Sequence, residues 1–260
     1  MAEDQRGKFV WYELLTSDAD AAQKFYKDVV GWKTAPFDDA QMPYTMWMKD
    51  DEAAVGGVMD LPEDARKRGV PPHWMAYVAV PDVDATTDRA GKLGGSTIMG
   101  PGDIPNVGRF AILADPQGAA ITAFKGSQEM PPGNAEPGPG DFSWAELATT
   151  DHEGAFDFYT QLFGWEKQEA MDMGEGAGVY QMFGRGGNMM GGMYNKTADQ
   201  PGPAWLYYIT IGDLDEAVKK VTKKGGTIIV EPMEVPGGSR IAVGIDPQGA
   251  AFGLHEMAKA

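Results

Sequence analysis

The sequence has no cysteine and no long apolar run. Without cysteine the chain forms no disulfide, offers no thiolate nucleophile and binds no metal through sulfur. A membrane-spanning helix needs about 20 consecutive apolar residues, and no stretch approaches that length. The N-terminal sequence MAEDQRGK also lacks the apolar region of a secretion signal. These absences predict a cytoplasmic protein that is neither held by disulfides nor embedded in a membrane.

Positive charge is also scarce in this chain. It has 22 Lys and Arg residues against 38 Asp and Glu residues, which gives a formal net charge of −16. Residues 1–130 carry −7 and residues 131–260 carry −9, so both halves are acidic. Such a surface repels nucleic-acid phosphates and anionic lipids. The composition therefore predicts neither a nucleic-acid partner nor a membrane partner.

One stretch of the chain occurs twice, 133 residues apart. The first copy runs from Phe9 to Lys33 and the second from Phe142 to Glu166. Both contain a Trp and a Glu two residues apart, an Asp before a helical pattern, a Phe-Tyr pair and a Gly-Trp pair. A repeat of this kind indicates two copies of one folding unit, and a chain of 260 residues has room for two domains.

Each half follows the order strand, helix and three strands, and then repeats that order. The closing hairpin of the first half has predicted strands at 108–114 and 119–125. They are joined by Asp115-Pro116-Gln117-Gly118, which fits a type I turn. A Pro/Gly-rich segment at 126–140 separates the halves. We therefore expect one domain at 1–127, a linker at 128–139 and a second domain at 140–260.

Three motifs carry a family resemblance. They are a strand followed by DADAAQKFYKDVVGW or DHEGAFDFYTQLFGW, a strand followed by PDVDATTDRAGKLGG or GDLDEAVKKVTKKGG, and a closing DPQGAA. Through them nearly the whole chain resembles the vicinal-oxygen-chelate superfamily of glyoxalase I, bleomycin-resistance proteins and extradiol dioxygenases. Within that superfamily it is similar to a tandem glyoxalase-like subgroup often labelled as hydroxylases. The resemblance implies an α+β fold with two tandem domains, each built of two βαβββ modules that enclose a cavity.

The resemblance also implies three metal-ligand positions in each half, and this chain departs from all of them. Family enzymes typically place His on the first and fifth strands and Glu near the end. The six positions here hold Trp11, Met75 and Thr122 in the first half and Trp144, Leu206 and Gly253 in the second. These side chains are poor ligands for a divalent ion, and none of the three histidines falls on a ligand position. We therefore expect no metal and no other cofactor.

Two glutamates are the expected catalytic bases or ligand-binding groups. Alternation along the first strand puts Glu13 on the same face as Trp11, and Glu146 on the same face as Trp144. The resemblance implies that this face lines the cavity, so both tryptophans are expected ligand contacts. A Glu on an otherwise apolar face is costly to bury without a partner, so each should have one nearby.

The closing hairpin supplies a candidate partner. With a four-residue loop at 115–118, Arg109 pairs with Phe124 and faces the cavity. The same register places Arg240 opposite His255 in the second half. Each domain would then hold one Glu and one Arg at one pocket. This arrangement predicts either an ion pair that fixes the sheet or a charged site for a polar ligand.

Three further residues share the expected cavity face. Tyr77 and Tyr208 alternate with the ligand positions, where each either fills space or anchors a ligand oxygen. His255 can act as a general base near neutral pH, and only the second half has it, because Phe124 takes its place in the first half. We therefore list Tyr77, Tyr208 and His255 as candidate ligand-binding residues.

Three functional hypotheses remain open from the sequence. The first is a metal-independent protein that binds and sequesters a small, partly aromatic organic molecule. The second is a glyoxalase-like lyase, an isomerase or a hydroxylase that uses Glu13 or Glu146 as its base. The third is a scaffold whose tandem form replaces a homodimer. The expected partner is a small-molecule ligand, and the expected assembly is either a monomer with an internal pseudo-dimer or a homodimer.

Overall fold

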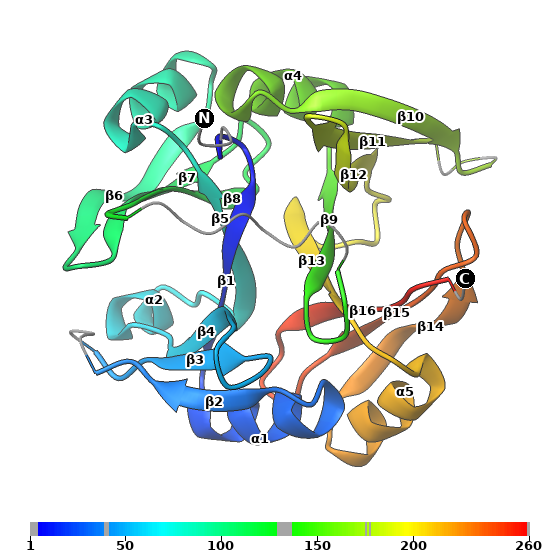
Figure 1. Ribbon diagram of the computed structural model, residues 1–260. Coiled ribbons are helices and arrows are strands. Elements are labelled where there is room, and N and C mark those ends of the chain that lie inside the picture. Colours follow the sequence, from blue (N-terminus) through cyan, green and yellow to red (C-terminus); the bar gives the residue numbers. More distant parts are fainter. Residues whose placement is uncertain (1–4, 39–41, 129–136, 175, 177, 259–260) are drawn as a thin grey trace. The chain divides into compact units, whose positions relative to one another are not determined.

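Figure 1 shows the computed structural model of the chain, in which residues 5–38, 42–128, 137–174, 176 and 178–258 are described. Most of the expected linker at 128–139 lies outside these residues. The first half contains β1 (Phe9–Thr16), α1 (Ala19–Val29), β2 (Lys33–Pro36), β3 (Thr45–Met48), β4 (Ala54–Asp60), α2 (Glu63–Lys67), β5 (His73–Ala79), α3 (Val83–Lys92), β6 (Ser96–Ile104), β7 (Gly108–Ala114) and β8 (Ala120–Gly126).

The second half repeats this order without a counterpart of α2. It contains β9 (Phe142–Thr149), α4 (His152–Phe163), β10 (Glu166–Asp172), β11 (Val179–Arg185), β12 (Asn188–Asn195), β13 (Ala204–Thr210), α5 (Leu214–Lys223), β14 (Thr227–Glu234), β15 (Arg240–Ile245) and β16 (Ala251–Glu256). The predicted order of three strands after the first helix includes β2 and β10, but the sequence analysis assigned them no bounds, and it missed α2. Their residues are mostly exposed, and α2 has no buried residue, so they lack the apolar periodicity that marks a buried element.

Each half forms one mixed sheet of eight strands. The strand orders are β2-β3-β4-β1-β5-β8-β7-β6 and β10-β11-β12-β9-β13-β16-β15-β14. In both sheets the first strand of a module pairs in parallel with its last strand, as β1 does with β4 and β5 with β8, and the hairpins between them are antiparallel. These pairings confirm the predicted α+β fold of two tandem domains built from βαβββ modules. Among the described residues, no helix is long and apolar enough to cross a membrane.

Aspartate begins the four longer helices. In each case its carboxylate accepts a hydrogen bond from the backbone N–H three residues later, at 2.8–3.0 Å. Ser17 and Thr150 precede two of these aspartates and are also typical capping residues, but the carboxylate takes the capping position in α1 and α4. A charged carboxylate interacts more favourably than a hydroxyl with the positive end of a helix. The capping residues are Asp18, Asp82, Asp151 and Asp213.

The chain divides into two compact units, and each unit takes one module from each half. The first unit comprises residues 1–10, 75–133 and 144–206, and the second comprises 11–74, 134–143 and 207–260. Within the first unit α3 packs against α4, and within the second α1 packs against α5 (Figure 1). Each unit thus joins helices that the sequence assigned to different domains.

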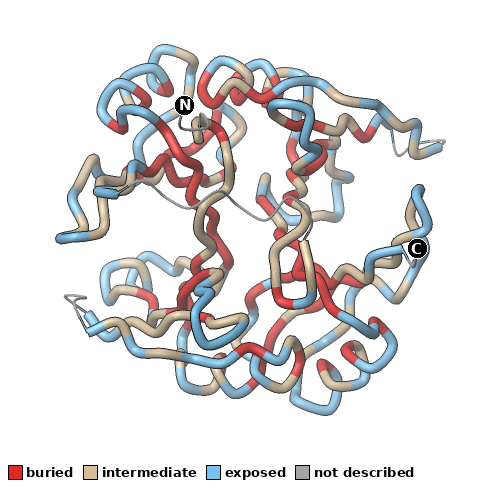
Figure 2. Tube along the Cα trace, viewed as in Figure 1, coloured by how far each residue is buried: buried red, intermediate tan, exposed pale blue. Residues whose placement is uncertain are grey.

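An aromatic cluster fills the core of the second unit. Trp32 and Trp47 are almost fully buried, with ring centroids 5.2 Å apart, and Trp74 packs edge-on against Tyr26 at 5.3 Å. The Trp32 indole N–H donates to the Gly140 carbonyl at 2.9 Å, which ties the start of the second half to the first module. Figure 2 shows the buried residues gathered on the central strands and on the inner faces of the helices.

The first unit has the equivalent cluster. Trp165 stacks on Phe183 at 4.5 Å and lies 5.2 Å from Tyr159, and both Trp165 and Phe183 are fully buried. The Trp165 indole N–H donates to the Gly7 carbonyl at 2.7 Å. The repeated Gly-Trp pair is therefore the anchor for the segment that precedes the opening strand of the other half.

A chain of buried hydrogen bonds crosses each unit. In the second unit the Trp74 indole N–H donates to the Tyr26 hydroxyl at 2.9 Å, and that hydroxyl donates to Asp246 Oδ2 at 3.2 Å. The other Asp246 oxygen accepts three backbone N–H groups, from residues 248, 249 and 250. Asp246 is 3% exposed, and burial raises the pKa of its carboxyl. One carboxylate of the closing loop thus holds both its own loop and a helix of the other half.

The first unit contains the same chain. Trp205 donates to the Tyr159 hydroxyl at 3.2 Å, and Tyr159 donates to Asp115 Oδ2 at 3.0 Å. Asp115 Oδ1 accepts from the backbone N–H groups of residues 117, 118 and 119. The Asp of the DPQG motif and the Tyr of the Phe-Tyr pair are therefore partners across the repeat.

We predict that Asp246→Ala lowers the free energy of unfolding by about 3 kcal/mol, because it leaves buried N–H and hydroxyl donors without an acceptor. Tyr26→Phe should cost about 2 kcal/mol, since it keeps the ring but removes two hydrogen bonds, the one accepted from Trp74 and the one donated to Asp246. Chemical denaturation measures both values, with the exposed Asp88→Ala in α3 as the matched control. A cost for Asp246→Ala no greater than that of Asp88→Ala would show that this hydrogen-bond chain is not structurally important.

We also predict that the fragments 1–130 and 138–260 do not form stable monomers separately, because each compact unit needs elements of both halves. When mixed, they should form a 1:1 complex with the circular dichroism of the intact chain. Analytical ultracentrifugation distinguishes the complex from self-associated fragments. Two folded, non-interacting monomers would instead support the domain boundaries expected from the sequence.

Candidate functional site

The closing hairpins have a register one residue different from the predicted one. Ala114 pairs with Ala120 rather than with residue 119, and Arg109 pairs with Lys125 rather than with Phe124. Five residues, 115–119, therefore connect the strands instead of four, and the Asp115 N–H donates to the Ala119 carbonyl at 2.9 Å across this loop. Side chains alternate along a strand, so a shift of one residue moves Arg109 to the opposite face of the sheet.

The predicted position of Arg109 on the cavity face was therefore wrong. Its guanidinium pairs with Asp84 on α3 at 2.7 Å and with Asp103 on β6 at 2.9 Å, which places it on the helix side of the sheet. Arg240 in the second half also forms ion pairs on the helix side of its sheet. It pairs with Glu256 on β16 instead of lying opposite His255, and it bonds Asp215 on α5 at 2.9 Å. These ion pairs remove the reason for placing either arginine at the ligand site.

Glu13 has a different partner, which the sequence analysis missed. The Tyr44 hydroxyl hydrogen-bonds the Glu13 carboxylate and accepts the Trp11 indole N–H at 2.8 Å. Glu13 is 7% exposed. On the neighbouring strand, Gly57 lies opposite Glu13, and a Cβ at Gly57 would collide with the Tyr44 ring. The missing side chain lets the tyrosine lie across β4 and reach the carboxylate.

The second copy has the same arrangement. The Trp144 indole N–H donates to the Tyr180 hydroxyl at 2.7 Å, and that hydroxyl donates to Glu146 Oε2 at 3.1 Å. Gly192 lies opposite Glu146, and a Cβ there would collide with the Tyr180 ring. Each half thus builds one Trp–Tyr–Glu chain from its first strand, a glycine on the neighbouring strand and a tyrosine, which lies just before β3 in the first half and on β11 in the second.

The tyrosines in these chains remain protonated. Burial raises the pKa of both hydroxyls far above its usual range, and the negative charge of the neighbouring glutamate raises it further. Each hydroxyl therefore donates its proton to the carboxylate and receives the indole N–H. A carboxylate has about four lone-pair sites, more than one tyrosine can use, so it can accept another donor.

The two copies differ beside the carboxylate. Tyr194 follows Gly192 on β12, and the charge of Glu146 raises the pKa of its hydroxyl after the larger effect of burial. The Gln200 amide donates to that hydroxyl at 2.9 Å. Counting from Gly57, the equivalent residue in the first half is Met59. The surroundings of Glu146 are therefore more polar than those of Glu13.

The remaining candidate residues lie on the second module of each half. Tyr77 is 6% exposed and packs edge-on against Phe124 at 5.7 Å. Tyr208 is 5% exposed and lies over Gly253, where a Cβ would collide with its ring. His255 is half-buried, its Nδ1 lies 2.8 Å from Ser143 Oγ, and burial lowers the pKa of its imidazole. Ser143 was not among the predicted site residues.

One signal in the sequence could have revealed Tyr44 and Tyr180. Each half has a Gly-Gly pair, at 56–57 and 191–192, on the strand beside the glutamate. Glycine inside a strand often marks a bend or the close approach of another group. The structure shows what approaches: the Tyr44 ring lies over Gly57, and the Tyr180 ring lies over Gly192. Glycine beside a cavity-facing Glu is a signal for such a ring.

The positions that bind metal in related enzymes do not fit a divalent ion here. The indole nitrogens of Trp11 and Trp144 carry hydrogens that they donate to tyrosines, so they offer no lone pair. Thr122 is fully buried and offers a neutral hydroxyl, and the ring of Tyr208 covers Gly253. In the described part of the chain, no group of three or more His, Cys, Asp or Glu is placed to hold a metal ion.

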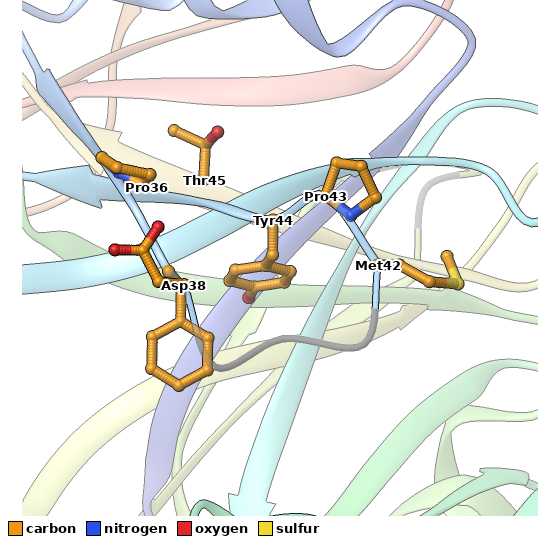
Figure 3. Close-up of a pocket in the computed structure, with 7 residues that line it drawn as sticks. Pro36, Asp38, Met42, Pro43, Tyr44 and Thr45 are labelled. Atoms are coloured by element: carbon orange, nitrogen blue, oxygen red, sulfur yellow. The ribbon is translucent and has the colours of Figure 1, made fainter.

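A pocket of about 400 Å³ lies at the ends of β2 and β3 (Figure 3). It is lined by Pro36, Phe37, Asp38, Met42, Pro43, Tyr44 and Thr45. Figure 3 shows the Tyr44 ring between Asp38 and Met42. Tyr44 therefore belongs both to this pocket and to the chain that ends at Glu13.

We predict that Gly192→Ala lowers the free energy of unfolding by about 2 kcal/mol, because the added methyl group must displace the Tyr180 ring. In a Tyr180→Ala background the same change should cost much less. The control is Gly91→Ala in α3, where a Cβ meets nothing within 4 Å and should stabilise the helix. Equal costs for Gly192→Ala with and without the ring would contradict this account.

Comparisons with known proteins agree with this architecture. The pattern of the Glyoxalase/Bleomycin resistance protein/Dioxygenase superfamily matches residues 8–122 and 141–254. The chain is 32% identical over 262 residues to the Mycobacterium tuberculosis protein named "Putative glyoxylase CFP32", covering 99% of this chain and 97% of that protein. It is 30% identical to the anthracycline biosynthesis protein DauV of Streptomyces sp. (strain C5), covering 98% of this chain and 94% of the relative.

Among solved structures, the Mn(II)-bound glyoxalase from Novosphingobium aromaticivorans superposes with a TM-score of 0.62. The match covers 98% of this chain and 83% of that structure at 15% sequence identity, which shows a common fold. The repeated βαβββ modules, the two family matches and the full-length relatives lead to one conclusion. The chain belongs to the Glyoxalase/Bleomycin resistance protein/Dioxygenase superfamily.

Proposed function

We propose that this chain binds a small, partly aromatic organic molecule without a metal ion, and sequesters it. The observation that carries the proposal is the duplicated Trp–Tyr–Glu chain. In each half an indole and a phenol ring surround a carboxylate that is already fixed by a hydrogen bond. Such a site offers an aromatic surface and an oriented acceptor for one hydroxyl or amino group of a ligand.

The chemistry of the side chains supports a ligand of this class. Because each Tyr hydroxyl uses its proton on the carboxylate, the Glu has an orientation fixed before a ligand arrives, which reduces the entropy cost of binding. The net charge of −16 disfavours anionic ligands. Anthracyclines are planar aromatic compounds that carry hydroxyl groups, so the relation to an anthracycline biosynthesis protein agrees with the same ligand class.

Metal independence follows from the residue types at the family positions. Trp, Met, Leu, Thr and Gly replace the histidines and glutamate that such enzymes use, and the indole nitrogens are committed as donors. The proposal therefore contains no step on a metal ion. We propose that the protein works in the cytoplasm as a monomer or a homodimer, with no nucleic-acid or membrane partner.

A second candidate function is an enzyme in which Glu13 or Glu146 removes a proton from its ligand. The burial of Glu13 favours it, since a carboxylate shielded from water and held in place by a tyrosine is positioned to accept a proton from a bound molecule. The reaction would be that of a glyoxalase-like lyase, an isomerase or a hydroxylase. Product formation, or exchange of a ligand C–H proton with deuterated water, separates this function from sequestration.

We predict that the protein binds 1,4-dihydroxyanthraquinone, a fluorescent aromatic probe with two hydroxyl groups, at two sites. Glu13→Gln and Glu146→Gln should each weaken one site by about tenfold or more, because the variant keeps the shape but loses the charged acceptor. Fluorescence titration measures both affinities. Glu52→Gln on an exposed turn is the matched control and should change neither.

The same titration tests metal independence. Chelator should leave both affinities and the melting temperature unchanged, and elemental analysis should find no stoichiometric divalent metal. Loss of binding on chelation would contradict the proposal. Binding that survives both glutamate substitutions unchanged would show that the Trp–Tyr–Glu chains are structural only.

A further inference from the structure

The pocket at the ends of β2 and β3 has two aromatic walls. Phe37 directly follows β2 and Tyr44 directly precedes β3, and the Phe37 N–H donates to the Tyr44 carbonyl at 3.0 Å. Their ring centroids lie 6.3 Å apart with an interplanar angle of 74°. Both residues line the pocket, and all its described lining residues belong to the second unit. The backbone bond thus holds two rings at an angle to each other on the pocket wall.

The rest of the wall is mainly apolar and partly rigid. Pro36 and Pro43 each have a φ angle fixed by their own ring. Met42 is 44% exposed and adds an unbranched, adaptable side chain. The volume of about 400 Å³ is within the range of pockets that hold small organic molecules. Because the prolines and the aromatic pair are already ordered, a bound molecule loses little affinity to reordering of the wall.

Asp38 gives the pocket its charge. Of the seven described residues that line it, Asp38 is the one with a charged side chain. Asp38 is exposed, so a molecule arriving from solvent can reach its carboxylate. Figure 3 shows this carboxylate beside the Tyr44 ring. The whole chain carries a net charge of −16, which raises the local concentration of cations. The pocket therefore favours a positively charged group.

A second carboxylate acts on the pocket through Tyr44. The Tyr44 hydroxyl hydrogen-bonds Glu13, which is 7% exposed. A phenol that donates to a carboxylate keeps more electron density on its ring, and the negative face of an aromatic ring attracts cations. The Trp11 N–H donates to the same hydroxyl, but a neutral donor has a weaker effect than a charged acceptor. Glu13 thus strengthens the attraction of the Tyr44 ring for a cation.

The corresponding hairpin of the second half carries a different pair. Met171 lies opposite Tyr180 in the register of β10 and β11, whereas Phe37 lies opposite Tyr44 in the first half. A methionine has no ring face to offer a cation. The aromatic residue opposite the tyrosine is therefore a feature of the first half, and Phe37→Met reproduces the pair of the second half.

We propose that this pocket is a binding site for an ammonium group carried on a small apolar or aromatic body. The ammonium group contacts the Tyr44 ring and the Asp38 carboxylate, and the body packs against Phe37 and Met42. This combination disfavours neutral and anionic molecules of the same shape. The site shares Tyr44 with the Trp–Tyr–Glu chain of the first half, but it does not rest on the proposed function.

Three probes of similar size test the charge preference: 2-phenylethylammonium, 2-phenylethanol and phenylacetate. Methyl NMR of the intact chain follows the Met42 signal during each titration, and Met42→Leu assigns that signal. The ammonium probe should bind about fivefold more tightly than the alcohol, and phenylacetate should bind more weakly than both. The difference between ammonium and alcohol should decrease as salt is added, because Asp38 is exposed.

Two substitutions locate the site. Asp38→Asn should weaken the ammonium probe about threefold, as expected for an exposed charge, and leave the alcohol unchanged. Phe37→Met should weaken both probes, because it removes an aromatic wall that both contact. The matched control is Asp88→Asn, an exposed aspartate in α3 of the other unit, which should change neither affinity. The titrations of the unmodified chain do not depend on whether either variant folds.

Three results would overturn the ammonium site. They are equal affinities for the ammonium probe and the alcohol, an ammonium affinity that Asp38→Asn leaves unchanged, and a Met42 signal that none of the probes moves. Unchanged binding of both probes by Phe37→Met would place them outside this pocket and would overturn it as well. The proposed function is judged separately, by the titration of 1,4-dihydroxyanthraquinone, so either idea can fail while the other stands.

Discussion

The buried aspartate of each closing loop is the contact on which this structure depends. Asp115 and Asp246 each satisfy three backbone N–H groups with one oxygen and a tyrosine hydroxyl with the other. The tyrosine comes from the first helix of the opposite half. A carboxylate buried to 3% exposure is tolerated only with such a complete set of donors. Loop geometry, helix position and the joining of the two halves therefore depend on the same two side chains.

That contact also decides which face of the sheet the side chains of the closing hairpin take. Because the carboxylate closes a loop that includes Ala119, the hairpin register moves by one residue, and Arg109 turns toward α3. Phe124 and His255 remain on the face of Tyr77 and Tyr208. The arginines pair with carboxylates on the helix side of the sheet, while each glutamate is held by its own tyrosine.

Much of the candidate site could be predicted, but its partners could not. Period-two alternation placed Trp11 with Glu13 and Trp144 with Glu146, and these pairs do share one tyrosine in each half. Tyr44 and Tyr180 were missed because they lie far from the glutamates in the sequence. The only local sign of them is a glycine opposite each glutamate, Gly57 or Gly192, which leaves space for the tyrosine ring. Ser143 was missed for the same reason, because its partner His255 lies 112 residues away and no local pattern links the two.

The sequence by itself determined the repeat, the βαβββ order, the α+β class, the absence of family-type metal ligands and the face of each glutamate. These depend on local periodicity, capping and residue type, which neighbouring residues specify. The tertiary structure alone decided the hairpin register, the Asp–Tyr contacts across the repeat and the partner of each carboxylate. These depend on residues as far apart as Tyr26 and Asp246, and on a loop whose length is set by one buried carboxylate. Local patterns carry no information about such contacts, because many distant partners satisfy the same pattern equally well.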